Sequence, residues 1–202
     1  MKAAIQTKEV RDAILDATDS LLARYGYKKM TIDDLAQEVG IGKGSIYLHF
    51  SSKEEIVLSH IDRIIERLKG ELEKIAKKNI SPGETLEKML LTRVLFRFDS
   101  VQHYTQSMND LLSSLRSKLL ARRKTYFEEE ANIFASVIEA GQKEKIFSEG
   151  PALEIAETFL IATNSLLPYS LSVTELGKRQ DIEKKTKRLA KLLIKGLLPN
   201  NL

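Results

Sequence analysis

The chain has 202 residues, which suffices for one large domain or for a small domain joined to a larger one. Hydrophobic residues make up 43% and charged residues 30% of the chain, a composition that excludes long intrinsic disorder and collagen-like or low-complexity structure. The net charge of +4 is unevenly spread, because residues 1–60 hold eight Lys and Arg against nine Asp and Glu. Bulk attraction to phosphate is therefore weak, and a nucleic-acid function has to rest on individually placed residues.

Cysteine is absent, which excludes disulfides, thiolate zinc sites and cysteine nucleophiles. The N-terminal sequence lacks the apolar run of a signal peptide. Charges also interrupt every apolar stretch well before the about 18 residues that a membrane span needs. We therefore expect a cytoplasmic protein without a membrane segment.

Few glycines and prolines interrupt long stretches of Leu, Ile, Ala, Lys and Glu, which is typical of an all-α protein. Apolar residues at three- and four-residue spacing predict a first helix with Thr7 as its N-cap and Gly26 as its end. Thr31 and Asp34 have the spacing of a capping box and predict a short second helix that ends at Gly40.

A third short helix is predicted over residues 43–50, directly after a glycine turn. Ser52 and Glu55 again fit a capping box, here at the start of a long fourth helix with one apolar face. Residues 79–83 should break that helix, and the next is expected over about 84–98.

The second half of the chain holds longer helices. Residues 99–140 lack Gly and Pro and are expected to form two helices whose boundary the sequence does not place, with Gly141 as the end signal. Pro151 should open an apolar helix over about 151–171, which Pro168 kinks or ends. A last helix is expected over about 181–198, which makes about nine helices in total.

The first three helices have the pattern of a helix-turn-helix, whose third helix enters the major groove of DNA. Ala36 is small where two helices must approach closely, and Gly40 permits a left-handed turn. Ile41 and Ile46 are spaced to bury beneath the second helix. These features predict the motif without establishing that it binds DNA.

Four segments follow one another at near-fixed spacing: YGY at 25–27, MTIDDLA at 30–36, VGIGKGSIYLHF at 39–50 and SKEEI at 52–56. Together they resemble the DNA-binding region of the TetR family of transcriptional regulators. Two positions depart from the family pattern, since Gly42 stands where Ser or Thr is usual and Leu22 stands where Phe is usual.

The resemblance implies a ligand-responsive DNA-binding regulator, most often a repressor released from its operator by a small effector. It implies a three-helix helix-turn-helix domain at residues 1–50 and a larger helical effector-binding and dimerisation domain at residues 51–202. The expected partners are double-stranded DNA with a pseudo-palindromic operator, a small-molecule effector and a second copy of the chain. The homodimer would form through the last two long helices.

Residue by residue, the resemblance implies that Thr31 caps the second helix and contacts a phosphate. The remaining backbone and base contacts would come from Lys43, Ser45, Tyr47, His49 and Lys53, and Gly44 would keep that surface flat. Leu48 occupies a position at which the family varies, and it is a candidate for contact with a base or a thymine methyl group.

Family members hold their effector among the middle helices, where apolar side chains predominate in this chain. The apolar composition favours a hydrophobic effector. The candidate effector-binding residues are Phe96, Phe98, His103, Tyr104, Met108, Tyr126, Phe134, Phe159 and Asn164.

The sequence lacks the residue spacing of nucleotide-binding and metal-binding enzyme motifs. A dinucleotide fingerprint that starts at Gly40 needs a preceding strand and a third glycine at the position of Ser45. A phosphate loop needs Ser or Thr directly after its lysine, where Gly44 stands. The three histidines form no metal-binding array, so we expect no metal, no cofactor and no catalysis. A helical module that only mediates protein association, without sequence-specific DNA binding, remains the alternative, although it does not explain residues 25–56.

Overall fold

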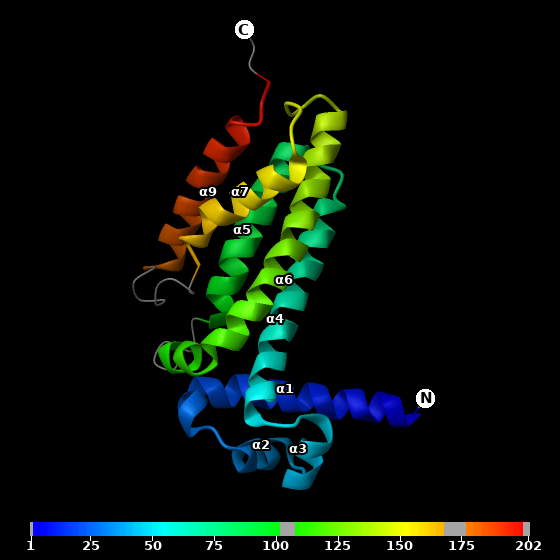
Figure 1. Ribbon diagram of the computed structural model, residues 1–202, viewed down its shortest axis with the longest axis vertical. Helices are drawn as coiled ribbons and strands as arrows, with labels where there is room; N and C mark the ends of the chain where they lie inside the picture. The colour runs from blue at the N-terminus through cyan, green and yellow to red at the C-terminus, as the bar shows by residue number, and fades with distance from the viewer. Residues whose placement is uncertain (1, 102–107, 168–176, 200–202) are drawn as a thin grey trace. The chain divides into compact units, whose positions relative to one another are not determined.

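The computed structural model describes residues 2–101, 108–167 and 177–199, and side chains within residues 7–101, 111, 113–167 and 177–199. All regular elements in these ranges are helices, which confirms the all-α prediction (Figure 1). Eight helices are described, close to the nine expected. They are α1 (Lys2–Lys29), α2 (Ile32–Val39), α3 (Lys43–His49), α4 (Lys53–Ala76), α5 (Pro82–Val101), α6 (Met108–Lys143), α7 (Ala152–Asn164) and α9 (Arg179–Lys195).

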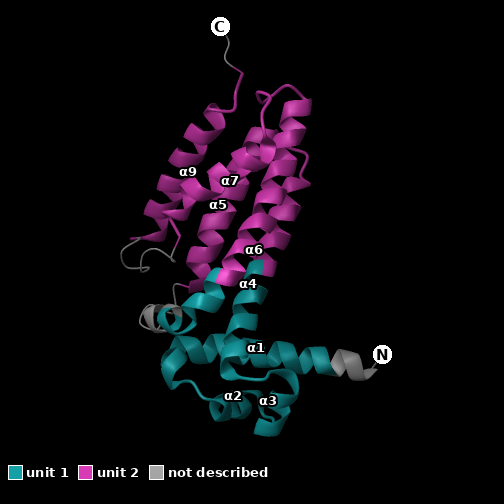
Figure 2. Ribbon diagram, in the orientation of Figure 1, with its two compact units in different colours: residues 1–65, 103–120 teal, residues 66–102, 121–202 magenta. Residues whose placement is uncertain are grey.

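The chain divides into two compact units (Figure 2). Unit 1 comprises residues 1–65 and 103–120, and unit 2 comprises residues 66–102 and 121–202. Helices α4 and α6 each contribute residues to both units. In unit 1, α1 packs against α2 and α3, and in unit 2, α5 packs against α9 and α7.

Helix α1 differs from its prediction at its start. It begins at Lys2, so Thr7 lies inside the helix and the expectation that it is the N-cap was wrong. The preceding residues include two alanines, and alanine favours the helix interior. Gly26 does interrupt the helix as expected, because its φ of 74° lies in the left-handed region that glycine tolerates.

The start of α4 forms half of the predicted capping box. The Ser52 hydroxyl accepts a hydrogen bond from the Glu55 N–H at 3.1 Å, as expected for an N-cap. The Glu55 carboxylate, however, accepts hydrogen bonds from the backbone N–H and hydroxyl of Ser51 rather than from the Ser52 N–H. The side chains of both serines and Glu55 thereby fix the start of α4.

The four described helices that follow α4 also differ from their predicted bounds. The helix expected over residues 84–98 is longer and spans Pro82–Val101. Two helices were expected over residues 99–140, but a single described helix, Met108–Lys143, occupies most of that stretch. Helix α7 ends at Asn164, short of the expected 171, and α9 spans Arg179–Lys195 rather than 181–198. The expected effect of Pro168 lies outside the described residues.

Gly141 was predicted to end its helix, but it lies inside the last turns of α6. Its function is close packing, because a Cβ atom placed there would lie 2.3 Å from Cδ2 of Phe147. Phe147 is buried, and it belongs to the main core of unit 2. The helix therefore needs glycine at this position because an aromatic ring lies against its backbone.

We expect Gly141→Ala to lower the free energy of unfolding by about 1–3 kcal/mol, because the new methyl group forces the Phe147 ring out of its packed position. Gly70→Ala in α4 is the matched control, since a Cβ there meets nothing within 4 Å. The control should raise stability by up to about 1 kcal/mol through helix propensity alone. Urea denaturation of both variants measures the difference, and equal effects would contradict the packing argument.

Candidate nucleic-acid interface

Helices α2 and α3 are joined by a turn whose geometry follows from a few residues. The Thr31 hydroxyl accepts the Asp34 N–H, and the Asp34 carboxylate accepts the Thr31 N–H at 2.8 Å, which completes the predicted capping box. These hydrogen bonds from the hydroxyl and backbone of Thr31 lower the pKa of Asp34. Gly40 ends α2 in the left-handed conformation with φ of 76°, and the Ile41 N–H then bonds to the Ala36 carbonyl at 3.0 Å.

Helix α3 is fixed to the rest of unit 1 by one apolar face. Ile46 and Phe50, one turn apart, are both buried. The Arg11 guanidinium from α1 lies 4.2 Å from the centre of the Phe50 ring, and it also donates to the His49 carbonyl at 3.1 Å. The opposite face of α3 is consequently left to solvent.

The exposed face of α3 carries most of the predicted DNA-contact residues. Lys43, Gly44 and Tyr47 are exposed, and the tyrosine retains 50% of its accessible surface. Ser45 and His49 lie at the edge of this face and are half-buried. A helix that is anchored on one side and presents a lysine, a flat glycine and a tyrosine on the other has the shape of a groove-reading element.

Lys43 is held by an acidic neighbour. Its Nζ donates to the Asp33 carboxylate at 2.8 Å, and this hydrogen bond and the accompanying charge raise the pKa of Lys43. Both side chains are more than half exposed, so the pair is weak. A phosphate oxygen or a base acceptor would have to compete with Asp33 for this ammonium group.

Lys53 has a structural contact that the sequence did not predict. Its Nζ donates to the carbonyls of Tyr27 at 2.9 Å and Met30 at 3.0 Å, and it lies 4.6 Å from the centre of the Tyr27 ring. These carbonyls lie at and just beyond the end of α1, where backbone acceptors lack helical partners. Lys53 therefore connects the start of α4 to the end of α1, and its predicted contact with DNA is a separate matter.

A family model described as "Bacterial regulatory proteins, tetR family" matches residues 14–59, which span the second part of α1, all of α2 and α3, and the start of α4. The chain belongs to the TetR family of transcriptional regulators. It is a DNA-binding transcriptional regulator with a helix-turn-helix.

Individual relatives of this TetR-family chain agree with that assignment. It is 29% identical over 153 residues to the HTH-type transcriptional repressor KstR2 of Rhodococcus jostii, an alignment that covers 74% of each chain. Alignments with the next three curated relatives cover between 29% and 43% of those proteins.

Solved structures share the fold. A transcriptional regulator from Cytophaga hutchinsonii superimposes with a TM-score of 0.77 at 24% identity over 93% of this chain and 98% of that one. The regulator FadR from Bacillus subtilis, solved with stearoyl-CoA, gives a TM-score of 0.67 at 18% identity over 92% and 98% of the two chains.

The predicted effector-binding residues fall into three groups in this TetR-family regulator. Phe134 and Phe159 are buried in the main core of unit 2, while Phe98 lies in a smaller cluster with Leu167 and Ile182. Half-buried side chains are those of Phe96, Tyr126 and Asn164. His103 and Tyr104 lie outside the described residues, and Met108 starts α6 with a side chain that is also outside them.

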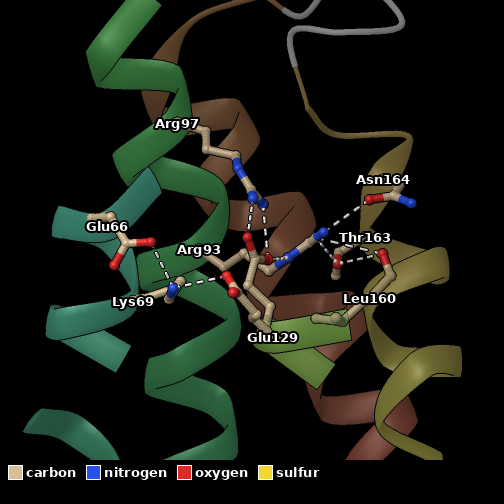
Figure 3. Close-up of polar contacts among 9 residues, drawn as sticks. Glu66, Lys69, Arg93, Arg97, Glu129, Leu160, Thr163 and Asn164 are labelled. Atoms are coloured by element: carbon tan, nitrogen blue, oxygen red, sulfur yellow. Dashed lines mark hydrogen bonds and ion pairs between the residues drawn. The ribbon is translucent and has the colours of Figure 1, made fainter. Parts of the chain in front are cut away.

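Unit 2 also contains a buried ionic network that the sequence analysis missed (Figure 3). Arg93 and Arg97 on α5 both pair with Glu130 on α6, and all three are almost fully buried. Arg93 also donates from Nη1 to the Thr163 hydroxyl at 2.8 Å and from Nη2 to the Asn164 side-chain carbonyl at 2.9 Å. The network joins α5, α6 and α7.

The two arginines favour the ionised form of Glu130. Burial alone would raise the pKa of Glu130, but the charges of Arg97 and Arg93 outweigh burial and hold that pKa below its ordinary value. The available sequence signal was two arginines one turn apart among apolar residues of α5, a spacing that puts both on one helix face. Asn164, a predicted effector-binding residue, takes part in this network through its hydrogen bond from Arg93.

No cluster of His, Asp and Glu side chains within the described residues is arranged to hold a metal ion. None of their helices is long and apolar enough to cross a membrane.

Proposed function

We propose that the chain is a ligand-responsive transcriptional repressor that binds a pseudo-palindromic operator as a homodimer and leaves it when a small, hydrophobic effector binds. The observation that carries this proposal is the face of α3 that includes Lys43, Gly44 and Tyr47. It is exposed, while the other side of the helix is anchored by Ile46 and Phe50. Packing among the described residues of unit 1 does not require a lysine and a tyrosine at these positions.

The DNA-contact residues follow from this placement. Lys43, Tyr47 and Ser45 would contact DNA from α3, with His49 at the edge and Gly44 allowing close approach. Thr31 would contact a phosphate from the start of α2, where backbone N–H groups also point outward. Lys53 would combine a phosphate contact with its structural bonds to the end of α1.

The proposed domains are a DNA-binding domain at about residues 1–50 and an effector-binding and dimerisation domain at residues 51–202. Helices α7 and α9 pack together in unit 2 and would form the dimer interface. Large apolar side chains support this, because Ile161 on α7 and Leu192 on α9 are 62% and 65% exposed. Burying them against a second copy would remove apolar surface from water.

The effector site is proposed among the aromatic residues of unit 2. Phe96 and Tyr126 are half-buried there, and the neighbouring core is apolar, which suits a hydrophobic ligand. The solved complex of FadR from Bacillus subtilis with stearoyl-CoA is consistent with this proposal. An effector that binds better to a dimer whose α3 helices are misaligned lowers DNA affinity by the same coupling free energy.

Helix α4 is the proposed lever, because its first part belongs to unit 1 with the DNA-binding helices and its last part belongs to unit 2. Two contacts within unit 1 fix the first turn of α4. Lys53 binds the end of α1, and Glu54 pairs with Lys118 of α6 at 2.7 Å. A shift of α4 or α6 would therefore act directly on the anchoring of the DNA-binding helices.

The test is selection of bound sequences from fragmented genomic DNA at about 0.15 M salt, since specific and non-specific binding separate at physiological salt. The control is the Lys43→Ala/Tyr47→Ala protein, whose changes lie on the exposed face of α3. We expect the native protein alone to enrich a pseudo-palindrome. Enrichment of no sequence by the native protein would favour the alternative, a helical association module.

Effector release has its own test. Small molecules extracted from the denatured protein after purification would be identified by mass spectrometry and added back to the protein–operator complex. We expect an apolar component of the extract to release the operator. Full retention of DNA at saturating concentrations of every extracted compound would contradict the effector part of the proposal.

A further inference from the structure

The most exposed large apolar side chain in the described part of the chain is Leu48, which keeps 83% of its accessible surface. It lies on α3 two residues after the buried Ile46, which places it about 200° around the helix from that residue. Leu48 therefore points directly away from the core of unit 1. Packing within the described structure gives no reason for an aliphatic residue at this position.

The surroundings of Leu48 leave room for close approach. Gly44 lies one turn earlier on the same face, and a Cβ atom there would meet nothing within 4 Å. Side chains on a helix lean toward its N-terminus, so the leucine leans over the glycine. Gly44 and Leu48 therefore lie on one exposed face of α3, next to the exposed Tyr47.

We propose that Leu48 reads sequence by contacting the C5-methyl group of a thymine in the major groove. The inference rests on the proposed binding of DNA through α3, and it adds the chemistry of one base contact. An aliphatic side chain can neither donate nor accept a hydrogen bond. In the major groove, the thymine methyl is the apolar group that base edges present, so it is the partner that removes both surfaces from water.

The contact also assigns different roles to neighbouring residues of α3. Lys43 and Tyr47 carry polar groups that suit phosphates and base acceptors, whereas Leu48 carries none. Substitutions of the polar residues should weaken binding to all sequences or alter hydrogen-bonded positions. A substitution of Leu48 should relax the preference at a single thymine in each half-site.

The experiment replaces each thymine of the selected operator with deoxyuridine, one symmetric pair at a time. Deoxyuridine pairs as thymine does and lacks only the methyl group. We expect the native protein to lose affinity at one pair, by about fourfold per half-site and about fifteenfold for both, as burial of one methyl group predicts. Leu48→Ala should bind the thymine operator more weakly, and it should show no further loss at that pair.

Leu120→Ala is the control variant, because Leu120 is an exposed leucine of the same unit on α6. It should keep the full sensitivity to deoxyuridine. Uniform insensitivity of the native protein, equal sensitivity of Leu48→Ala, or a half-site without thymine would overturn the inference while leaving DNA binding intact. Failure of the native protein to bind any selected sequence would overturn the proposed function as well.

Discussion

Replacing Glu130 with alanine is expected to lower the free energy of unfolding by about 3–5 kcal/mol, because it leaves two buried guanidinium groups without their shared carboxylate. Glu130 is fully buried, so water cannot replace the lost charge. The effect should appear as a lower midpoint in urea denaturation followed by circular dichroism.

Two matched variants separate charge from general disruption. Glu139→Ala, on the same helix but exposed, should change stability by less than about 0.5 kcal/mol. Glu130→Gln keeps the shape and removes the charge, so it remains measurable if the alanine variant does not fold. A glutamine variant as stable as the native protein would show that the network contributes no net charge stabilisation.

The network also predicts a pH dependence. Because the pKa of Glu130 is held below its ordinary value of 4.5, its contribution to stability is fully present above that value. The contribution is lost as the pH falls through the lower pKa of the folded state. The stability difference between the native protein and Glu130→Gln should therefore shrink on acidification below about pH 4.5 and stay constant from about pH 6 to 8.

Replacing Lys53 with alanine is expected to affect both folding and DNA binding. Loss of the charged hydrogen bonds to the carbonyls of Tyr27 and Met30 should lower the free energy of unfolding by about 1.5–3 kcal/mol. Affinity for DNA should fall about equally for all sequences, and the slope of log affinity against log salt should become shallower by about one per protomer.

Lys74→Ala is the control for the lost charge, because Lys74 lies on the same helix, is exposed and pairs with Glu71 on the surface. It should leave both stability and the salt slope near the native values. Reduced stability with an unchanged slope would assign Lys53 a purely structural role. An unchanged stability would contradict the anchoring of α4 to α1.

The sequence predicted the helix-turn-helix well because its signals are local. The side chains of Thr31 and Asp34 each accept a hydrogen bond from the other's backbone N–H within one turn. Gly40 adopts the left-handed conformation, which glycine tolerates easily. Ile46 and Phe50 are spaced for one buried face, as the structure confirms. Such features need no knowledge of distant parts of the chain.

The missed features depend on contacts between distant residues. Gly141 carries an end signal, but its lack of a side chain serves the packing of Phe147. Lys53 and Tyr27 are far apart in sequence, and Arg93 meets residues of both α6 and α7. A local pattern in a single sequence does not predict which buried charged residues will form ion pairs.

The central claim, that the exposed face of α3 makes this chain a sequence-specific DNA-binding protein, is tested most directly by one ratio. The dissociation constants for the selected operator and for a permuted sequence of the same length and composition would be measured at about 0.15 M salt. We expect the operator to bind at least about a thousandfold more tightly, and the Lys43→Ala/Tyr47→Ala protein to lose most of that preference. Equal affinity of the native protein for the two sequences would contradict the claim.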